Sequence, residues 1–294
     1  MKPPPFEYHR ARTLPEALEV LTELTDEVRI LAGGQSLVPL MNFRLAQPEH
    51  ILDINPIEEL DYVRRDNGSL VVGATARQAT VEHSDEARAA VPLLIAALGH
   101  VAHPPIRHRG TVVGSLAHAD PAAELPTVAL ATGAALTLTS SSGVRSVAAE
   151  EFFLGPFETA TEPGELVTEV RFPAAPPESG HAFVEYARRH GDFAIAGAAV
   201  TIALDGERIS DASIALCSVG PRPVRATAAE GLLRGAEPTD ELLATAAARA
   251  VEGLEPAADI HGSTEYRVGV ARTQVRRALS LAVQRARDKG AAAA

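Results

Sequence analysis

The sequence predicts an α+β protein in two parts, a mixed helix-and-strand part followed by three strands and then three helices. The first observation is the run Pro-Ala-Ala-Pro-Pro-Glu-Ser-Gly at 173–180, which is typical of a linker between domains. The second is the order of patterns: strand and helix patterns are mixed before the linker and form separate blocks after it. The expected units are a first domain at 1–175, divided near residue 55 into 1–55 and 56–175, a second domain at 176–287, and a disordered Gly-Ala tail at 288–294.

The elements of the first domain follow from capping signals and apolar spacing. The run Thr13-Leu-Pro-Glu16 is a capping-box pattern with an early proline, and it predicts a helix that carries leucines at 18, 21 and 24. Apolar runs predict strands at 28–32, 51–54, 70–73 and 165–172, and a hairpin from 134–139 and 144–147 around Ser-Ser-Ser-Gly. We also expect an alanine-rich helix at 85–98, a strand leading into a loop at 110–117, and a helix at 122–132.

The second domain is expected to be a three-stranded antiparallel sheet with three helices. Strand patterns cover 181–189, 194–204 and 208–219, and Asp205-Gly206 predicts a hairpin between the last two. Helices are expected from about residues 224, 240 and 264.

Composition and charge exclude several classes of function. A formal net charge of -11 argues against binding to nucleic acid or to anionic membranes, since both favour a basic surface. The basic stretch at 272–289 is interpreted as a last helix with a solvated basic face, with a basic interaction surface as the alternative. The sequence contains no apolar run of about 18 residues, so no membrane-spanning helix is expected. The amino-terminal residues do not resemble a secretory signal, so a cytoplasmic protein is expected.

The single cysteine, Cys217, limits the redox chemistry of the chain. An iron–sulfur cluster normally needs four thiolates or a mixture of thiolates and histidines, so this chain is not expected to hold one. A zinc site built on several cysteines and an internal disulfide are excluded for the same reason. The alternating run around Cys217 predicts a small buried side chain in a strand rather than a nucleophile.

Two glycine-bearing segments could bind an anion. Ala32-Gly33-Gly34-Gln35-Ser36 follows a predicted strand, and its glycines could expose successive backbone N–H groups just before a helix that starts at Leu37. Thr111-Val112-Val113-Gly114-Ser115 repeats this chemistry 79 positions later. Together the two segments could clamp a diphosphate, and the alternative is two tight turns without a ligand.

Four runs of this sequence resemble one protein family in the same order along nearly the whole chain. They are Ala-Gly-Gly-Gln-Ser-Leu-Val-Pro-Leu-Met-Asn-Phe-Arg-Leu at 32–45, Thr-Val-Val-Gly-Ser-Leu-Ala-His-Ala-Asp-Pro-Ala-Ala-Glu-Leu-Pro at 111–126, Ala-Arg-Arg-His-Gly-Asp-Phe-Ala at 187–194, and Ser-Val-Gly-Pro-Arg-Pro-Val-Arg-Ala at 218–226. The family is the FAD-binding (medium) subunit of molybdenum hydroxylases, typified by aerobic carbon monoxide dehydrogenase and xanthine dehydrogenase. The resemblance implies a first domain of the vanillyl-alcohol-oxidase (PCMH) type.

The resemblance also implies which residues contact FAD. The pyrophosphate and ribityl chain would lie against Ala32, Gly33, Gly34, Gln35, Ser36 and Leu37, and against Thr111, Val112, Val113, Gly114 and Ser115. The family usually has Gly-Gly where this chain has Val113-Gly114, so either the Val113 side chain points away from the phosphates or the local backbone differs from that of the family. Glu124 matches an acid that binds ribityl hydroxyls, with His118 and Asp120 close by. Leu166 would pack near the flavin and Val101 on the adenine side, while Asp192 and Phe193 match a mobile loop beside the isoalloxazine. Phe193 would either stack on the flavin or fill the interface between the two domains.

The function that the resemblance implies is electron transfer rather than substrate chemistry. Electrons would reach FAD from a separate [2Fe–2S] small subunit, whose own source is a molybdopterin large subunit, and would leave to an external acceptor. We expect no catalytic residue and no metal in this chain, and a dimer of heterotrimers of the carbon monoxide dehydrogenase-like or other small-molecule hydroxylase type. The alternatives are a stand-alone FAD-dependent oxidoreductase and a flavin-free assembly or binding protein on the same fold. A metal site among His100, His103, His108 and His118 is disfavoured because their spacing does not place two on one helix face.

Overall fold

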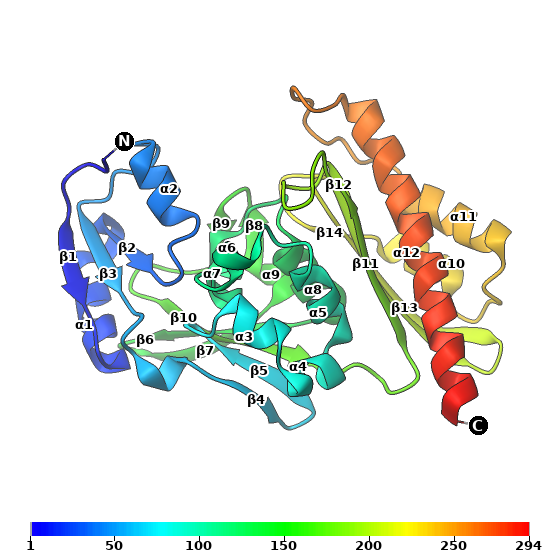
Figure 1. Ribbon diagram of the computed structural model, residues 1–294, viewed down its shortest axis with the longest axis horizontal. Coiled ribbons are helices and arrows are strands. Elements are labelled where there is room, and N and C mark those ends of the chain that lie inside the picture. The colour runs from blue at the N-terminus through cyan, green and yellow to red at the C-terminus, as the bar shows by residue number, and fades with distance from the viewer. Residues whose placement is uncertain (1, 294) are drawn as a thin grey trace.

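The computed structural model describes residues 2–293, in which three larger sheets follow one another along the molecule (Figure 1). The amino-terminal sheet is parallel and has the order β1-β3-β2. Its elements are β1 (Glu7–Arg10), α1 (Leu14–Leu24), the short 3₁₀ turn η1 (Thr25–Glu27), β2 (Val28–Leu31), α2 (Leu37–Asn42) and β3 (His50–Asp53). Helix α1 begins as predicted, because the Thr13 hydroxyl accepts a hydrogen bond from the Glu16 N–H at 3.4 Å.

The central sheet is antiparallel, with the order β4-β5-β10-β6-β7. Its strands are β4 (Val63–Asp66), β5 (Ser69–Gly73), β6 (Ala135–Ser140), β7 (Gly143–Ala148) and β10 (Leu166–Pro173), preceded by the 3₁₀ turn η2 (Glu58–Leu60). Helices cover it, as Figure 1 shows, and they are α3 (Gln78–Glu82), α4 (Asp85–Ala90), α5 (Pro92–Leu98), α6 (Pro104–Arg107), α7 (Val112–His118), α8 (Glu124–Thr132) and α9 (Ala149–Phe152). A small hairpin pairs β8 (Phe153–Gly155) with β9 (Glu158–Thr159).

Two predictions in this central region were wrong. The single helix expected at 85–98 is two helices, because Pro92 disfavours a helical conformation of the residue before it, and Val91 leaves the helix with φ -136° and ψ 68°. The strand and loop expected at 110–117 are largely the helix α7. The Thr111 hydroxyl caps this helix by accepting a hydrogen bond from the Gly114 N–H at 3.0 Å.

The carboxy-terminal sheet has four antiparallel strands rather than the three we predicted. They are β11 (Gly180–Tyr186), β12 (Ala196–Asp205), β13 (Arg208–Cys217) and the two-residue β14 (Val224–Arg225). Strand β14 lies where a helix was expected to start, and two residues are too few to show an alternating pattern. The hairpin at Asp205-Gly206 is confirmed, since Asp205 pairs with Arg208.

Helices α10 (Thr227–Leu233), α11 (Asp240–Ala250) and α12 (Thr264–Ala293) complete the chain. The disordered tail predicted at 288–294 was wrong for the described part, because α12 continues to Ala293, and residue 294 lies outside the described residues. Alanine is the strongest helix former, which explains why the final alanines extend the helix.

Both faces of the carboxy-terminal sheet are covered, one by α12 and the other by helices of the central region. Val200, Ile202 and Ile214 belong to the core that includes residues of α12, whereas Ala199 and Ala215 belong to the core of the amino-terminal part. Figure 1 shows α12 along one face of this sheet, with α5 and α8 on the side toward the central region. Cys217 is fully buried on the same side as Ala199, so the predicted small buried side chain is confirmed.

A candidate flavin site between two backbone segments

The two glycine-bearing segments lie against each other through their backbones. A Cβ atom added at Gly33 would lie 2.6 Å from the Arg109 carbonyl oxygen and 2.6 Å from the Gly110 Cα. Gly34 has φ +72°, a conformation that glycine adopts without strain. The fold therefore brings the two glycine-bearing segments, which lie 79 positions apart in the sequence, into contact. The absence of a side chain at Gly33 allows the two backbones to lie this close.

Asn55 and Arg77 hold this contact in place. The Asn55 amide Nδ2 donates to the Ala32 carbonyl at 2.8 Å, and the Arg77 guanidinium donates through one nitrogen to Asn55 Oδ1 at 2.6 Å. The other terminal nitrogen of Arg77 donates to the Arg109 carbonyl at 2.6 Å. Arg77 thus links the end of the first segment to the start of the second.

Several backbone N–H groups remain available around this contact. Among the described residues, the amides of Gly33, Gly34, Gln35 and Ser36 donate no hydrogen bond within the chain. The Gln35 side chain folds back, with Nε2 donating to the Gly33 carbonyl at 3.1 Å, whereas Ser36 is exposed at the end of the segment. Successive unbonded amides of this kind suit an anionic ligand such as a phosphate.

The valines of the second segment do not obstruct such a ligand. Val112 and Val113 are buried in the core of the amino-terminal part, with Val113 2% exposed. Their side chains therefore lie away from the surface, which agrees with the first of the two alternatives for Val113. Gly114 and Ser115 are half-buried, and a Cβ at Gly114 would lie 2.5 Å from the Thr111 hydroxyl that caps the helix.

Glu124 offers a buried carboxyl on α8, the helix that follows α7. It lies in the first turn of α8 and is 6% exposed, and among the described residues it makes no hydrogen bond to another side chain. Burial raises its pKa to about 7. His118 is half-buried, with a pKa lowered by burial and its ring 5.0 Å from that of Phe157, while Asp120 accepts a hydrogen bond from the Ala122 N–H at 2.8 Å.

The raised pKa of Glu124 predicts a pH-dependent contribution to stability. Between pH 4.5 and about 7 the folded chain keeps a proton that the unfolded chain has released, so the free energy of unfolding falls as the pH rises through this window. The full effect is about 3 kcal/mol. We expect Glu124→Gln to gain about this much relative to the unchanged protein between pH 4.5 and pH 8. Urea unfolding of both proteins in flavin-free form measures it, and a difference that does not change with pH contradicts the expectation.

The remaining predicted residues occupy two different places. Leu166 is 2% exposed on β10, beside the pair Thr139 and Thr168, so it presents little surface. Val101 is half-buried, and its carbonyl accepts a hydrogen bond from Arg107 at 3.0 Å. Gly191 packs on Ala102 and His103, where an added Cβ would lie 2.9 Å from the Ala102 carbonyl oxygen. The loop with the exposed Asp192 and Phe193 therefore lies next to the Val101 segment.

The interface between the two parts contains an ionisable pair that the sequence did not reveal. His100 Nδ1 lies 3.3 Å from Glu185 Oε1 of β11, and Glu185 raises the pKa of His100. The Glu185 side chain is 5% exposed, and burial together with the charges of Glu185 and Glu124 raises the pKa of the Cys217 thiol. A buried thiol that resists ionisation is a poor nucleophile and a poor metal ligand.

Arg77 and Asn55, which position the candidate site, were not predicted from the sequence. Asn55 had a usable signal, because Asn55-Pro56 directly follows a predicted strand that lies parallel to the strand ending at the glycines. Arg77 lies 22 residues further on in an ordinary sequence, and only the folded chain brings it to Arg109.

We expect Arg77→Ala to weaken FAD binding about tenfold or more. The change removes two hydrogen bonds and leaves Asn55 Oδ1 and the Arg109 carbonyl without this donor, which costs roughly 1–3 kcal/mol. Fluorescence titration of flavin-free protein measures the affinity, with Arg64→Ala, a change at a guanidinium that lies over the Tyr62 ring, as the control. Equal affinities for both variants contradict the role of Arg77.

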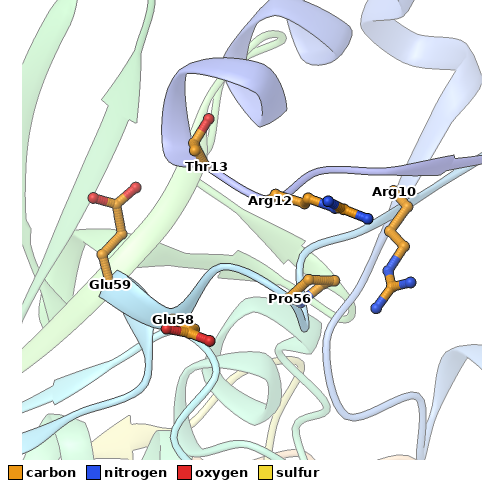
Figure 2. Close-up of a pocket in the computed structure, with 6 residues that line it drawn as sticks. All are labelled: Arg10, Arg12, Thr13, Pro56, Glu58 and Glu59. Atoms are coloured by element: carbon orange, nitrogen blue, oxygen red, sulfur yellow. The ribbon is translucent and has the colours of Figure 1, made fainter.

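A polar hollow beside the start of α1 contains none of the residues predicted to bind FAD. It is lined by Arg10, Arg12, Thr13, Pro56, Glu58 and Glu59, and Figure 2 shows the two arginines on one side and the two glutamates on the other. Glu59 accepts a hydrogen bond from the Leu14 N–H at 2.8 Å at the start of α1. We therefore interpret Glu59 as part of the cap of α1.

Comparisons with known proteins identify the family. Residues 4–175 match the model described as FAD binding domain in molybdopterin dehydrogenase, and residues 181–282 match the CO dehydrogenase flavoprotein C-terminal domain. The chain is 43% identical over 288 residues to the 6-hydroxypseudooxynicotine dehydrogenase complex subunit alpha of Paenarthrobacter nicotinovorans, covering 98% of this chain and 97% of that protein. It is also 43% identical over 286 residues to caffeine dehydrogenase subunit beta of Pseudomonas sp. (strain CBB1), covering 97% of each.

A solved structure agrees with these relatives. A chain of carbon monoxide dehydrogenase from Hydrogenophaga pseudoflava, in a form that lacks the Mo-pyranopterin moiety, superposes with a TM-score of 0.95 at 40% identity and covers 97% of this chain and 99% of that one. The fold and the family models thus define an FAD-binding oxidoreductase subunit. The chain belongs to the family of FAD-binding medium subunits of molybdenum hydroxylases, which confirms the resemblance of the four runs. FAD is its cofactor.

Proposed function

We propose that this chain is the electron-transfer subunit of a heterotrimeric molybdenum hydroxylase. In this proposal a separate [2Fe–2S] subunit supplies the electrons, a molybdopterin subunit oxidises the substrate, and two heterotrimers associate. When bound, FAD accepts electrons and releases them to an external acceptor. A location in the cytoplasm is part of the proposal; no helix within residues 2–293 is long and apolar enough to cross a membrane.

The observation that carries the proposal is the backbone contact between Gly33 and residues 109–111. It places unbonded amides of 33–36 next to the capped start of α7, where a pyrophosphate can be bound by N–H groups from one side. Glu124 adds a buried carboxyl that can bind ribityl hydroxyls, and the buried Val113 leaves room for the phosphates. These features fit the polar middle of FAD.

The Asp192-Phe193 loop is the part of the proposed site that must rearrange. Adenine and isoalloxazine are the two ends of FAD, yet the loop assigned to the isoalloxazine lies beside the Val101 segment assigned to the adenine. Phe193 is 64% exposed, and Gly191 beside it has φ +87°. We propose that this loop moves away from Ala102 and His103 when FAD binds, so that Phe193 can cover the flavin.

The source of the electrons follows from the cysteine content. The chain has one cysteine, and Cys217 is fully buried between the two parts of the molecule. Since a [2Fe–2S] cluster normally needs four ligands of the thiolate or imidazole type, the clusters must belong to another chain.

The stand-alone oxidoreductase is less well supported. Such an enzyme needs acid–base residues for its own substrate, but three buried ionisable groups of the carboxy-terminal domain have structural partners. Glu230 pairs with Arg225, Arg267 donates to Asp259 at 2.6 Å, and His181 lies 2.9 Å from the Ser179 hydroxyl. Flavin absorption in the purified protein would exclude the flavin-free alternative.

Purification from the native host tests the heterotrimer. We expect the chain to copurify with a small cysteine-rich chain and a large molybdenum-containing chain in equal amounts, with the absorption of both flavin and iron–sulfur clusters. Full substrate oxidation by a preparation that contains this chain alone contradicts the proposal.

A further inference from the structure

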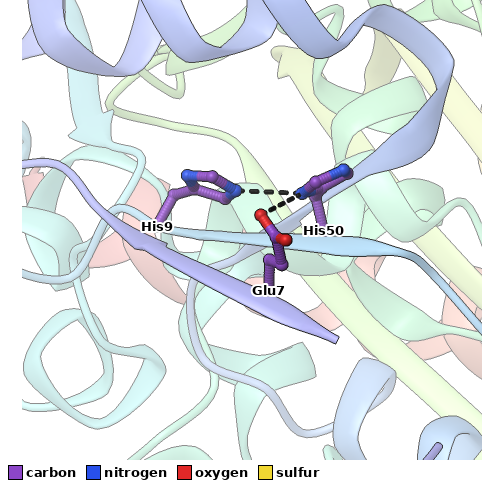
Figure 3. Close-up of side chains that lie close together, drawn as sticks. All are labelled: Glu7, His9 and His50. Carbon is purple, nitrogen blue, oxygen red and sulfur yellow. Dashed lines mark hydrogen bonds and ion pairs between the residues drawn. The ribbon is translucent and has the colours of Figure 1, made fainter. Parts of the chain in front are cut away.

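Two histidines and a glutamate meet on one face of the amino-terminal sheet, away from the residues assigned to FAD. Strands β1 and β3 are parallel neighbours, and Glu7 lies opposite His50 in their register. Because side chains alternate between the faces of a strand, His9 lies on the same face as Glu7. The register thus brings together residues 41 positions apart, and Figure 3 shows the three side chains converging.

The distances between their polar atoms suit a metal ion. His9 Nε2 lies 3.0 Å from His50 Nδ1, and Glu7 Oε2 lies 3.6 Å from the same His50 nitrogen. All three ligand atoms lie within 4.8 Å of one another. Ligand atoms about 2.0–2.1 Å from a tetrahedral zinc ion are separated by about 3.3 Å, so small side-chain movements would place these atoms on one face of the tetrahedron.

The second nitrogen of His50 has a carboxylate nearby. His50 Nε2 lies 4.0 Å from Glu27 Oε2, at the end of η1. A histidine bound to metal through one ring nitrogen usually donates the other N–H to a carboxylate or carbonyl, which fixes the ring and its tautomer. The His50 side chain is 16% exposed and has a carboxylate near each ring nitrogen, whereas Glu7 is 77% and Glu27 62% exposed. The cluster therefore has a largely buried side at His50 and an open side at Glu7.

We propose that Glu7, His9 and His50 bind a divalent transition-metal ion of the zinc type, with water as a further ligand and Glu27 supporting His50. Two imidazoles and one carboxylate match the preference of zinc for nitrogen and oxygen ligands. The metal joins the short strand β1 to β3, so it stabilises the amino-terminal lobe by binding the folded chain. The metal site takes no part in the flavin chemistry. The proposal of a metal site therefore does not depend on the proposed function.

Zinc titration of tag-free protein against a coloured chelator tests this site. We expect one equivalent of Zn²⁺ to bind, with affinity reduced at least tenfold in His50→Ala and in His9→Ala, and a rise in the midpoint of thermal unfolding only where zinc binds. Glu27→Gln should weaken binding by about tenfold, as loss of an outer carboxylate does. His83→Ala is the matched control, because that exposed histidine bonds the Ala79 carbonyl on α3 and should leave zinc binding unchanged.

Cobalt and flavin content provide independent measurements. Co²⁺ in the unchanged protein should give the intense visible absorption of a tetrahedral ion, and this should be lost in the double variant His9→Ala/His50→Ala. The FAD content should be equal in all variants. Equal zinc affinity in the unchanged protein and the double variant overturns the proposal, as does an equal loss in His83→Ala. In that case the 3.0 Å contact is only a hydrogen bond between two imidazoles.

Discussion

Replacing Gly33 with alanine is expected to lower the affinity for FAD at least a hundredfold. The new Cβ would lie 2.6 Å from both the Arg109 carbonyl oxygen and the Gly110 Cα, and 3.0 Å from the Thr111 amide nitrogen. These are backbone atoms and cannot rotate away, so the two segments must separate by several tenths of an ångström or more. Separation breaks the arrangement of amides that the pyrophosphate needs, and a loss of about 3 kcal/mol corresponds to somewhat more than a hundredfold.

Flavin titration of the Gly33→Ala protein measures this effect, with unfolding in urea as a check that the chain still folds. Gly231→Ala is the matched control, because no atom lies within 4 Å of its added Cβ and it is far along the chain in α10. Full FAD occupancy in Gly33→Ala would show that the backbone contact does not form the flavin site.

Gly180→Ala is expected to have the largest effect on stability, with a loss of about 3 kcal/mol or more. Gly180 opens β11 against α12, and an added Cβ would lie 1.8 Å from the Ala282 carbonyl oxygen and 2.5 Å from the Ala286 amide nitrogen. The helix must move off the sheet, and it then loses packing against the core that contains Val275, Leu279 and Val283. Overpacking that shifts backbone costs 1–3 kcal/mol and sometimes more.

Urea unfolding measures this loss, and Gly269→Ala in α12 provides the control. Gly269 has no atom within 4 Å of its added Cβ, so alanine there should stabilise the helix by up to about 1 kcal/mol. A Gly180→Ala protein as stable as the unchanged one would contradict the close contact between the β11 and α12 backbones at this position.

The sequence predicts those parts of the fold in which local chemistry decides the structure. Helix α1 is predicted by its Thr13 cap and its leucines. The hairpin is predicted by Asp205-Gly206, a pair of residues that favours a tight turn between two strands. Strand β1 reads Glu-Tyr-His-Arg and is mostly exposed, so it has no apolar alternation to reveal it. Its place in the sheet is set by pairing with β3, a contact that no local pattern records.

The candidate site divides in the same way. The two glycine-bearing segments were visible because glycines, hydroxyls and the family resemblance point to the same chemistry. Arg77 and Asn55 were not, since their role depends on hydrogen bonds to backbone carbonyls of residues that only the fold brings near. The meeting of His9 and His50 is likewise a consequence of strand register.

The most direct test of the central claim is anaerobic reduction of the flavin in the FAD-loaded isolated chain. The compound that the complete complex oxidises, added to the isolated chain, should leave the yellow flavin absorption unchanged. A chain with a single, buried cysteine is not expected to bind the iron–sulfur cluster that would pass electrons to the flavin. Addition of the reduced [2Fe–2S] subunit should then bleach it. Bleaching by the substrate alone would contradict the account, because the isolated chain would then carry out the substrate chemistry itself.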